Sequence, residues 1–129
     1  AKSGRDVRMI TPGVPDKGYV HMVPRSYYAP LLRAVVRVYE YIPGFIHSKT
    51  MVCDDAFGIC GTINMDYRSL FLHHECAVWM FGSSAIMDMK QSFTDTLSKC
   101  VEITPELYRN RPWLMKLGQS LLRVFAPLM

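Results

Sequence analysis

The chain has no long hydrophobic run, no low-complexity segment and no internal repeat. A membrane-spanning helix needs roughly 18 or more consecutive apolar residues, and no segment approaches that length, so we expect the chain to be soluble. Residues Ala1 to Asp6 lack the charged, apolar and small-residue regions of a signal peptide. The sequence also begins without an initiator Met, which suggests a piece cut from a longer protein.

The cysteines lack close pairing, and the net charge is modest. None of the four cysteines forms a Cys-x-x-Cys pair, and in apolar segments a thiol behaves as a small hydrophobic group. This usage favours a reducing, cytoplasmic setting. The net charge of +4 favours anionic lipid surfaces or phosphate-bearing substrates, but it is too small to indicate a nucleic-acid-binding protein.

The composition predicts one domain with its own hydrophobic core. The 129 residues are 50% hydrophobic and 20% charged, which excludes a disordered chain and fits a mixed α/β or α+β domain over residues 1–129. Strands are predicted in apolar, β-branched segments, and helices where apolar residues recur at helical spacing. The strands are Val7–Ile10, Val36–Tyr41, Phe45–Cys53, Phe57–Cys60 and Leu70–Phe81; the helices are Asp16–Ala34, one capped by Ser83 or Ser84, one starting at Thr104-Pro105, and a helical C-terminus after Pro112.

A motif of three residues carries most of the functional information. His47, Lys49 and Asp54 follow the pattern H-x-K-x-x-x-x-D, and Gly61-Thr62-Ile63-Asn64 comes shortly after them. At average residue frequencies the three-residue pattern would occur by chance on the order of once in a hundred chains of this length. The following Gly and Asn make a chance match negligible, so the pattern is a strong signal.

The spacing of His47 and Lys49 suits chemistry on a phosphodiester. Side chains two residues apart on a strand share a face, so both would point into one pocket. A neutral histidine can attack phosphorus and form a phosphohistidine, while a lysine ammonium neutralises the non-bridging oxygens. The sequence therefore predicts a nucleophile and a charge-stabilising group side by side.

Other polar residues can complete this site. Thr62 and Asn64 offer neutral hydrogen-bond donors to the phosphate oxygens, on which negative charge builds in the transition state. Asp54, or more plausibly Glu75, can bond the second imidazole nitrogen and fix its tautomer. No metal or other cofactor is expected, because a lysine within the motif would repel a divalent ion and no second His or Cys stands at ligand spacing.

Each of these residues also has an ordinary structural explanation. A single histidine in an apolar strand is usually a core residue, a single lysine is usually solvated, and Asp54-Asp55 would form a common turn. Taken together, these explanations are less plausible than a catalytic site. The adjacent His73 and His74 would face opposite sides of a strand, so at most one of them is expected near the site.

With these motifs the chain resembles the phospholipase D superfamily. The flanking residues narrow the resemblance to the carboxy-terminal half of bacterial cardiolipin synthases, and it extends over nearly the whole chain. The segments that carry it are YEYIPGFIHSK at residues 39–49, GTINMDYRSLFLHHE at residues 61–75, and the ending LLRVFAPLM.

The resemblance implies a fold and a reaction. The fold would be an α/β/α sandwich around a mixed β-sheet. The reaction would be metal-independent transfer of a phosphatidyl group between two phosphatidylglycerol molecules, through a phosphohistidine, to give cardiolipin and glycerol. By matching positions, the motif roles fall on His47, Lys49 and Asp54, the phosphate-binding roles on Thr62 and Asn64, and the supporting carboxylate on Glu75.

The chain departs from this family in carrying one copy of the motif where the synthases carry two. A nucleophilic histidine cannot also protonate the leaving glycerol oxygen on the opposite side of phosphorus, so a second acid is required. We expect it from an amino-terminal half of a longer protein, located at the bacterial cell membrane, or from a second copy of this chain. His47 is either the nucleophile or the acid, and the isolated chain is expected to be inactive unless it is paired.

Two other functions stay open at this point. One is a single-motif phosphodiesterase or nuclease that completes its site as a homodimer, although the absence of a basic, aromatic-rich face weakens the nucleic-acid version. The other is a folded half-domain that serves only for assembly or lipid contact.

Overall fold

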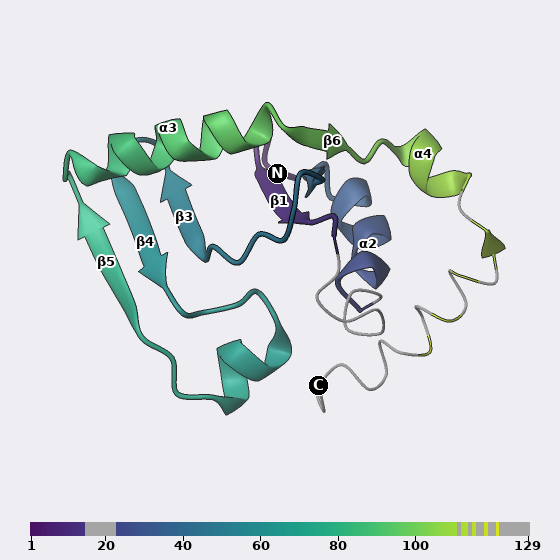
Figure 1. Ribbon diagram of the computed structural model, residues 1–129, viewed down its shortest axis with the longest axis horizontal. Helices are drawn as coiled ribbons and strands as arrows, with labels where there is room; N and C mark the ends of the chain where they lie inside the picture. Colours follow the sequence, from purple (N-terminus) through teal and green to yellow (C-terminus); the bar gives the residue numbers. More distant parts are fainter. Residues whose placement is uncertain (15–22, 111, 114, 116–117, 119–120, 122–129) are drawn as a thin grey trace. The chain divides into compact units, whose positions relative to one another are not determined.

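The computed structural model describes residues 1–14, 23–110, 112, 113, 115, 118 and 121, and it contains two compact units (Figure 1). The first unit is formed by residues Ala1–Ile46 together with the chain from Lys99 onward. The second is formed by His47–Ser98. Each unit has its own three-stranded sheet, and each is described below by itself.

The first unit is built on a mixed sheet. Strand β1 (Arg8–Pro12) pairs in parallel with β2 (Arg37–Tyr41), and β6 (Cys100–Glu102) pairs antiparallel with the other edge of β2. The central position of β2 explains its burial, because Val38 is fully buried and Tyr39 nearly so. The fold therefore joins strands that lie about 60 residues apart in the sequence.

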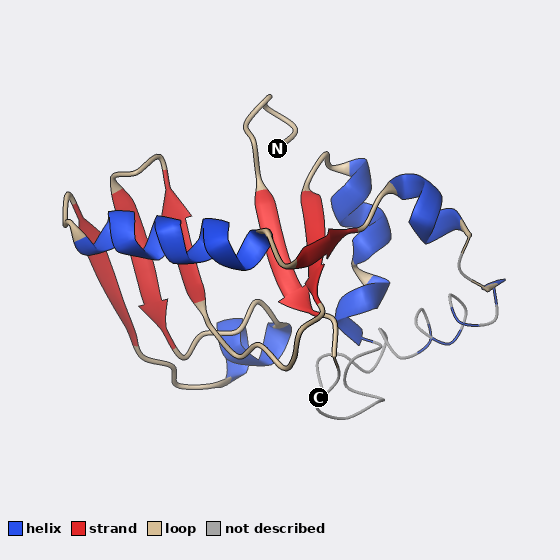
Figure 2. Cartoon of the chain, turned by 45° about the horizontal axis from the view of Figure 1, so that its top comes forward, coloured by secondary structure: helices blue, strands red, loops and turns tan. Residues whose placement is uncertain are grey.

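Two short helices complete the core of this unit. Helix α2 (Tyr28–Arg33) packs on β2 and on helix α4 (Pro105–Arg109) (Figure 2). Tyr28, Val38 and Ile103 form the buried cluster at the centre. Helix α4 begins at Thr104, whose hydroxyl accepts a hydrogen bond from the Leu107 N–H, as its N-cap position predicts.

Polar groups inside the first unit are paired. Arg25 holds both carboxylate oxygens of Glu40, at 2.8 Å each. The hydroxyl of Tyr28 lies 2.7 Å from that of Thr11. Burial raises the pKa of Tyr28 to about 12; the negative charge of Glu40 adds to the increase, and the Thr11 hydrogen bond opposes it.

The second unit is an antiparallel sheet covered on one face by a helix. Strands β3 (Thr50–Cys53), β4 (Phe57–Gly61) and β5 (Ala77–Phe81) are neighbours in that order, and helix α3 (Ala85–Leu97) runs across them (Figures 1 and 2). Ile86 of α3 is fully buried and approaches Gly58 closely, since a Cβ on Gly58 would lie 3.1 Å from Ile86 Cγ1.

The opposite face of this sheet carries exposed apolar side chains. Met51 of β3 and Trp79 of β5 belong to the same cross-strand row and are 48% and 63% exposed. Phe57 and Phe81 face each other in a second row, with ring centroids 4.9 Å apart. Alternation along each strand thus separates a helix-covered face from an aromatic one.

The α/β class expected from the sequence is confirmed. The strand predictions for Val7–Ile10, Val36–Tyr41 and Phe57–Cys60 correspond to β1, β2 and β4 within a residue or two. The prediction of one long strand over Leu70–Phe81 was wrong. Residues Arg68–Leu72 instead form a π-helix, and only Ala77–Phe81 is a strand.

Three further predictions differ from the structure or fall partly outside the residues that it describes. The strand predicted over Phe45–Cys53 is confirmed only for Thr50–Cys53, since residues 45–49 belong to no helix or strand. The helix predicted over Asp16–Ala34 is partly outside the described residues, and its described end is helical at residues 23–26 and in α2. The helical C-terminus predicted after Pro112 falls mostly on residues outside the described part of the chain.

Candidate functional site

All of the predicted site residues lie in the second unit. This unit begins at His47, the first residue of the motif. The Lys49 carbonyl accepts a hydrogen bond of 3.2 Å from the Gly61 N–H, so the β3–β4 pairing extends back to Lys49. The Lys49 ammonium in turn donates to the His47 carbonyl at 2.9 Å. The backbone therefore holds the H-x-K segment against the start of the Gly61–Asn64 segment.

Thr62 and Glu75 form the best-defined contact of the site. The Thr62 N–H bonds the Cys76 carbonyl at 2.9 Å, and the Cys76 N–H bonds the Thr62 hydroxyl oxygen at 3.1 Å. The Thr62 hydroxyl then donates to Glu75 Oε2 at 2.5 Å. These contacts continue the β4–β5 pairing by one residue, and they fix a carboxylate whose side chain is only 16% exposed.

The pKa of the Glu75 carboxyl is held below its usual value. The main cause is the hydrogen bond from Thr62; partial desolvation opposes it, and a hydrogen bond from Ser69 and the electrostatic influence of His73 and Lys49 lower the pKa further. The influence of Lys49 links this carboxylate to the H-x-K segment. Glu75 is therefore an ionised acceptor in the part of the unit that contains Lys49.

Gly61 is required by close packing between strands. It pairs with Ala77, and a Cβ at this position would lie 2.6 Å from the Ala77 Cα atom and would also meet the Cys76 carbonyl oxygen. Any side chain would force β4 and β5 apart just before Thr62. Gly61 therefore allows β4 and β5 to pack closely enough for Thr62 to contact Glu75.

Asp54 lies at the other end of β3, in the turn to β4. Both Asp54 and Asp55 have positive φ angles, 49° and 57°, and they belong to the three-residue loop between the paired residues Cys53 and Phe57. The Asp55 carboxylate also forms an ion pair with the Lys90 ammonium of helix α3, at 2.6 Å. Five residues of extended chain span about 16 Å, so the structure does not bring the Asp54 carboxylate to Lys49.

Asn64 lies in the exposed loop that follows β4. Within the described residues its side chain makes no hydrogen bond, so its amide is available to a ligand. The loop continues into the π-helix, where Asp66 accepts the Ser69 N–H at 2.7 Å. Ser69 is buried and orders the path of the chain between Asn64 and Glu75.

Sequence reasoning missed one pair of side chains beside Glu75. The Arg68 Nε–H donates to His73 Nε2 at 2.6 Å, and His73 Nδ1 lies 3.9 Å from Glu75 Oε1. A strand beginning at Leu70 would carry His73 away from Arg68, so the strand prediction hid the pair. The two-residue spacing of His73 and Glu75, which puts both on one face of an extended segment, was the available signal.

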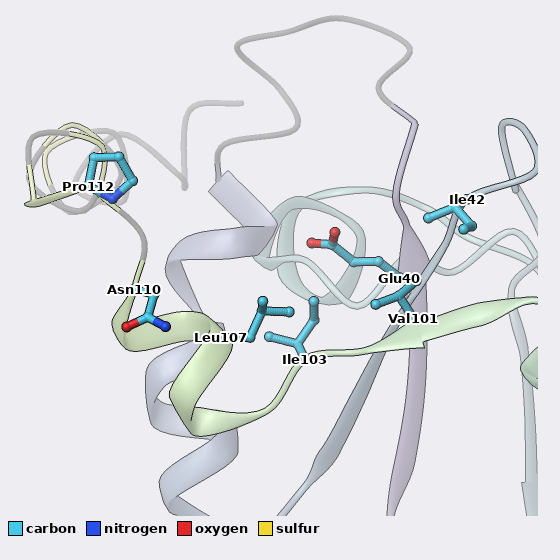
Figure 3. Close-up of a pocket in the computed structure, with 7 residues that line it drawn as sticks. All are labelled: Glu40, Ile42, Val101, Ile103, Leu107, Asn110 and Pro112. Carbon is cyan, nitrogen blue, oxygen red and sulfur yellow. The ribbon is translucent and has the colours of Figure 1, made fainter.

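A surface cavity in the described part of the chain lies elsewhere. It belongs to the first unit and holds the Glu40 carboxylate above apolar side chains (Figure 3). None of the predicted site residues lines it. Its lining residues are Glu40, Ile42, Val101, Ile103, Leu107, Asn110 and Pro112.

In the described part of the chain, no group of three or more His, Cys, Asp and Glu side chains is arranged to hold a metal ion. No helix among the same residues has both the length and the hydropathy of a membrane span.

Comparison with known proteins decides the family. A family model described as "Cardiolipin synthase, PLD-like domain" matches residues 1–97. The chain belongs to this phospholipase D-like family. The matched region includes the whole segment from His47 to Glu75.

Full-length relatives are similar along the entire chain. A cardiolipin synthase of Clostridium perfringens (strain SM101) is 36% identical over all 129 residues, and one of Halalkalibacterium halodurans is 38% identical over the same span. A protein of Streptococcus mutans named "Uncharacterized protein" is also 38% identical. The chain covers 27%, 26% and 28% of these three proteins, respectively, so it spans about a quarter of their length.

Proposed function

We propose that this chain is one half of the site of a cardiolipin synthase, transferring a phosphatidyl group between two phosphatidylglycerol molecules. The observation that carries the proposal is the pairing of the His47–Lys49 segment with the Gly61–Thr62 strand end, beside an ionised Glu75. Similarity to cardiolipin synthases over the whole chain supports the choice of lipid substrate. On this proposal residues 1–129 are a phospholipase D-like domain, carrying the second motif of a longer two-motif enzyme.

The reaction needs two steps at one phosphorus atom. In the first, an imidazole nitrogen attacks the phosphorus of phosphatidylglycerol, the bond from phosphorus to the glycerol oxygen breaks, and an acid protonates the departing oxygen. In the second, the hydroxyl of another phosphatidylglycerol loses its proton to the group that acted as acid and attacks phosphorus. The nitrogen–phosphorus bond breaks, leaving cardiolipin, glycerol and the original histidine.

The proposal assigns a role to each residue of the site. His47 is either the attacking base or the acid, and Glu75 is the carboxylate that orients its imidazole. Lys49 neutralises the phosphate oxygens, and Asn64 donates to them from the loop. The hydroxyl proton of Thr62 is directed at Glu75, so Thr62 can bind phosphate only by turning away from it. Asp54, the motif carboxylate, acts through the conformation of the hairpin.

The second acid must come from outside this chain, since only one H-x-K-x-x-x-x-D motif is present. We propose that an amino-terminal half with its own motif supplies it, or else a second copy of this chain. Phosphatidylglycerol and cardiolipin are anionic, so the paired enzyme would work at an anionic membrane surface, and the net charge of +4 is compatible with that location. No nucleic acid and no cofactor are needed.

The test is cardiolipin formation from phosphatidylglycerol vesicles by the full-length protein and by this chain alone. In the full-length protein we expect His47→Ala and Lys49→Ala each to lower the rate by about a thousandfold or more, as loss of a residue that acts on the reacting atoms does. The matched control is His74→Ala, because His74 makes no side-chain hydrogen bond or ion pair among the described residues.

Each result has a definite meaning. A fully active His47→Ala or Lys49→Ala protein would overturn the site assignment. Activity of this chain alone, abolished by His47→Ala, would favour a homodimeric phosphodiesterase or synthase in which two copies of the motif meet. Hydrolysis to phosphatidic acid without cardiolipin would identify a phosphodiesterase, and inactivity of all forms would favour an assembly or lipid-contact module.

A further inference from the structure

His73 stands between a cation and the candidate carboxylate. Its Nε2 atom accepts the Arg68 Nε–H at 2.6 Å, and its Nδ1 atom lies 3.9 Å from Glu75 Oε1. The other Glu75 oxygen, Oε2, accepts the Thr62 hydroxyl proton. Arg68, His73, Glu75 and Thr62 therefore form one chain of polar contacts that ends at the β4–β5 junction.

The Arg68 contact determines which imidazole nitrogen carries the proton. A guanidinium has only donors, so Nε2 can face it at 2.6 Å only as an unprotonated acceptor. The neutral ring then carries its proton on Nδ1, the atom that faces Glu75. Arg68 thus orients the N–H dipole of His73 toward the carboxylate.

We propose that His73 is a positioning residue for the transfer reaction, keeping the Glu75 carboxylate in the orientation that serves His47. This proposal rests on the proposed function, since it needs Glu75 to orient the reacting histidine. The Thr62 hydroxyl donates to Glu75 Oε2, and the His73 imidazole faces Oε1 at 3.9 Å. Without His73 the carboxylate would keep its hydrogen bonds from Thr62 and Ser69 but would lose the polar group that faces Oε1.

A purely structural role makes a different prediction. The Arg68–His73 bond closes the loop around the π-helix Arg68–Leu72, and the His73 N–H also bonds the Arg68 carbonyl at 2.9 Å. If His73 served only to keep the loop ordered, its essential atom would be Nε2, which accepts the hydrogen bond from Arg68. If positioning of Glu75 matters, the essential feature is the donor that faces the carboxylate.

Three substitutions separate these two features. His73→Asn places an amide N–H near the position of Nδ1 but removes the acceptor for Arg68, whereas His73→Gln can offer an oxygen near the position of Nε2 but has no donor near Nδ1. His73→Phe removes both while keeping a flat ring. The control is His74→Phe, at the neighbouring position.

Kinetics of the full-length enzyme give the first readout. We expect His73→Gln and His73→Phe to lower kcat by about tenfold, the effect of losing one interaction made in the transition state, with KM almost unchanged. His73→Asn should stay within about threefold of the wild type, and His74→Phe should have no effect. The opposite order, with Gln active and Asn impaired, would overturn the proposal, as would equal activity of all variants.

Nuclear magnetic resonance of this 129-residue chain gives a readout that needs no activity. Nitrogen shifts should show His73 as the Nδ1–H tautomer, and His73→Phe should raise the pKa of the Glu75 carboxyl, while His74→Phe leaves it unchanged. An Nε2–H tautomer, or a Glu75 titration unaffected by His73→Phe, would overturn the proposal. An inactive wild-type enzyme with the expected NMR result would instead count against the proposed function alone.

Discussion

The Thr62 hydroxyl donates a 2.5 Å hydrogen bond to the Glu75 carboxylate across 13 residues of sequence. The bond is possible because Thr62 follows β4 and Glu75 precedes β5, and the two strands pair up to Gly61 and Ala77. One side chain therefore links the Gly-Thr-x-Asn segment to the supporting carboxylate. Its removal should affect both the electrostatics and the chemistry of the site.

Replacing Thr62 by Val should change how stability depends on pH. The pKa of Glu75 is lowered in the folded chain, so its contribution is fully present above the unfolded value near 4.5 and is lost as the pH falls through the folded pKa. Thr62→Val reduces this shift, so the variant should lose less stability on acidification below pH 4.5 than the wild type does. Urea unfolding at several acidic pH values measures this.

Thr62→Ser is the matched control for that experiment, because it keeps the hydroxyl. It should retain the pH dependence of the wild type. An identical pH dependence in the Val and Ser variants would show that the hydrogen bond does not control the ionisation of Glu75.

Sequence reasoning found the parts of the structure that depend on local chemistry. Strand β2 was predictable from its β-branched and aromatic residues, and the start of α4 from Thr104 followed by Pro105. The turn at Asp54-Asp55 was predictable because Asp tolerates positive φ better than most residues. The motif identified its candidate residues without any structure.

Features that depend on tertiary contacts were not predictable. The run Leu70-Phe71-Leu72 has the composition of a strand, yet it lies in a π-helix and its side chains are 50%, 71% and 58% exposed. Local propensity is overridden here by contacts of the loop, such as the Ser69 N–H to Asp66. The separation of about 16 Å between Lys49 and Asp54 arises because the residues between them form strand β3. The sequence spacing alone does not show where that strand ends.

Gly61→Ala should destabilise the chain much more than Gly58→Ala. A methyl group on Gly61 meets backbone atoms of the paired strand, 2.6 Å from Ala77 Cα, whereas one on Gly58 meets the side chains of Ile86 at 3.1 Å and Met80 at 3.4 Å. Side chains can move and strand backbone cannot, so we expect a loss of about 2–3 kcal/mol for Gly61→Ala and about 1 kcal/mol or less for Gly58→Ala. Chemical denaturation of both variants measures the difference, and equal losses would contradict the packing explanation.

Substitutions at Asp54 should separate its charge from its backbone conformation. At a φ of 49°, Asn adopts the left-handed region nearly as well as Asp, while Ala is disfavoured by about 1 kcal/mol. We expect Asp54→Asn to keep near-wild-type stability and transfer activity, and Asp54→Ala to lose stability. Thermal unfolding and the cardiolipin assay measure the two effects. An Asn variant that is stable but inactive would show that the carboxylate itself is needed.

The wild-type chain should become less stable at high pH because of Tyr28, and Tyr28→Phe should abolish this decline. Burial raises the pKa of Tyr28 from 10.0 to about 12, so the folded state keeps this proton longer than the unfolded chain does. The resulting stability is fully present below pH 10 and is lost as the pH rises through about 12. The Phe variant should lack this decline. Unfolding measured between these pH values tests it, and a tyrosine titrating near 10 at this position would contradict the assignment.

The two sheets also differ in how far apart in the sequence their strands lie. Strands β3, β4 and β5 follow one another along the chain, whereas β6 joins β2 only after about 60 intervening residues. Closing a longer loop costs more chain entropy, and sheets made of neighbouring strands generally form faster. We therefore expect the hairpin that carries His47, Lys49 and Thr62 to gain its structure early in refolding, before the sheet of the first unit is complete.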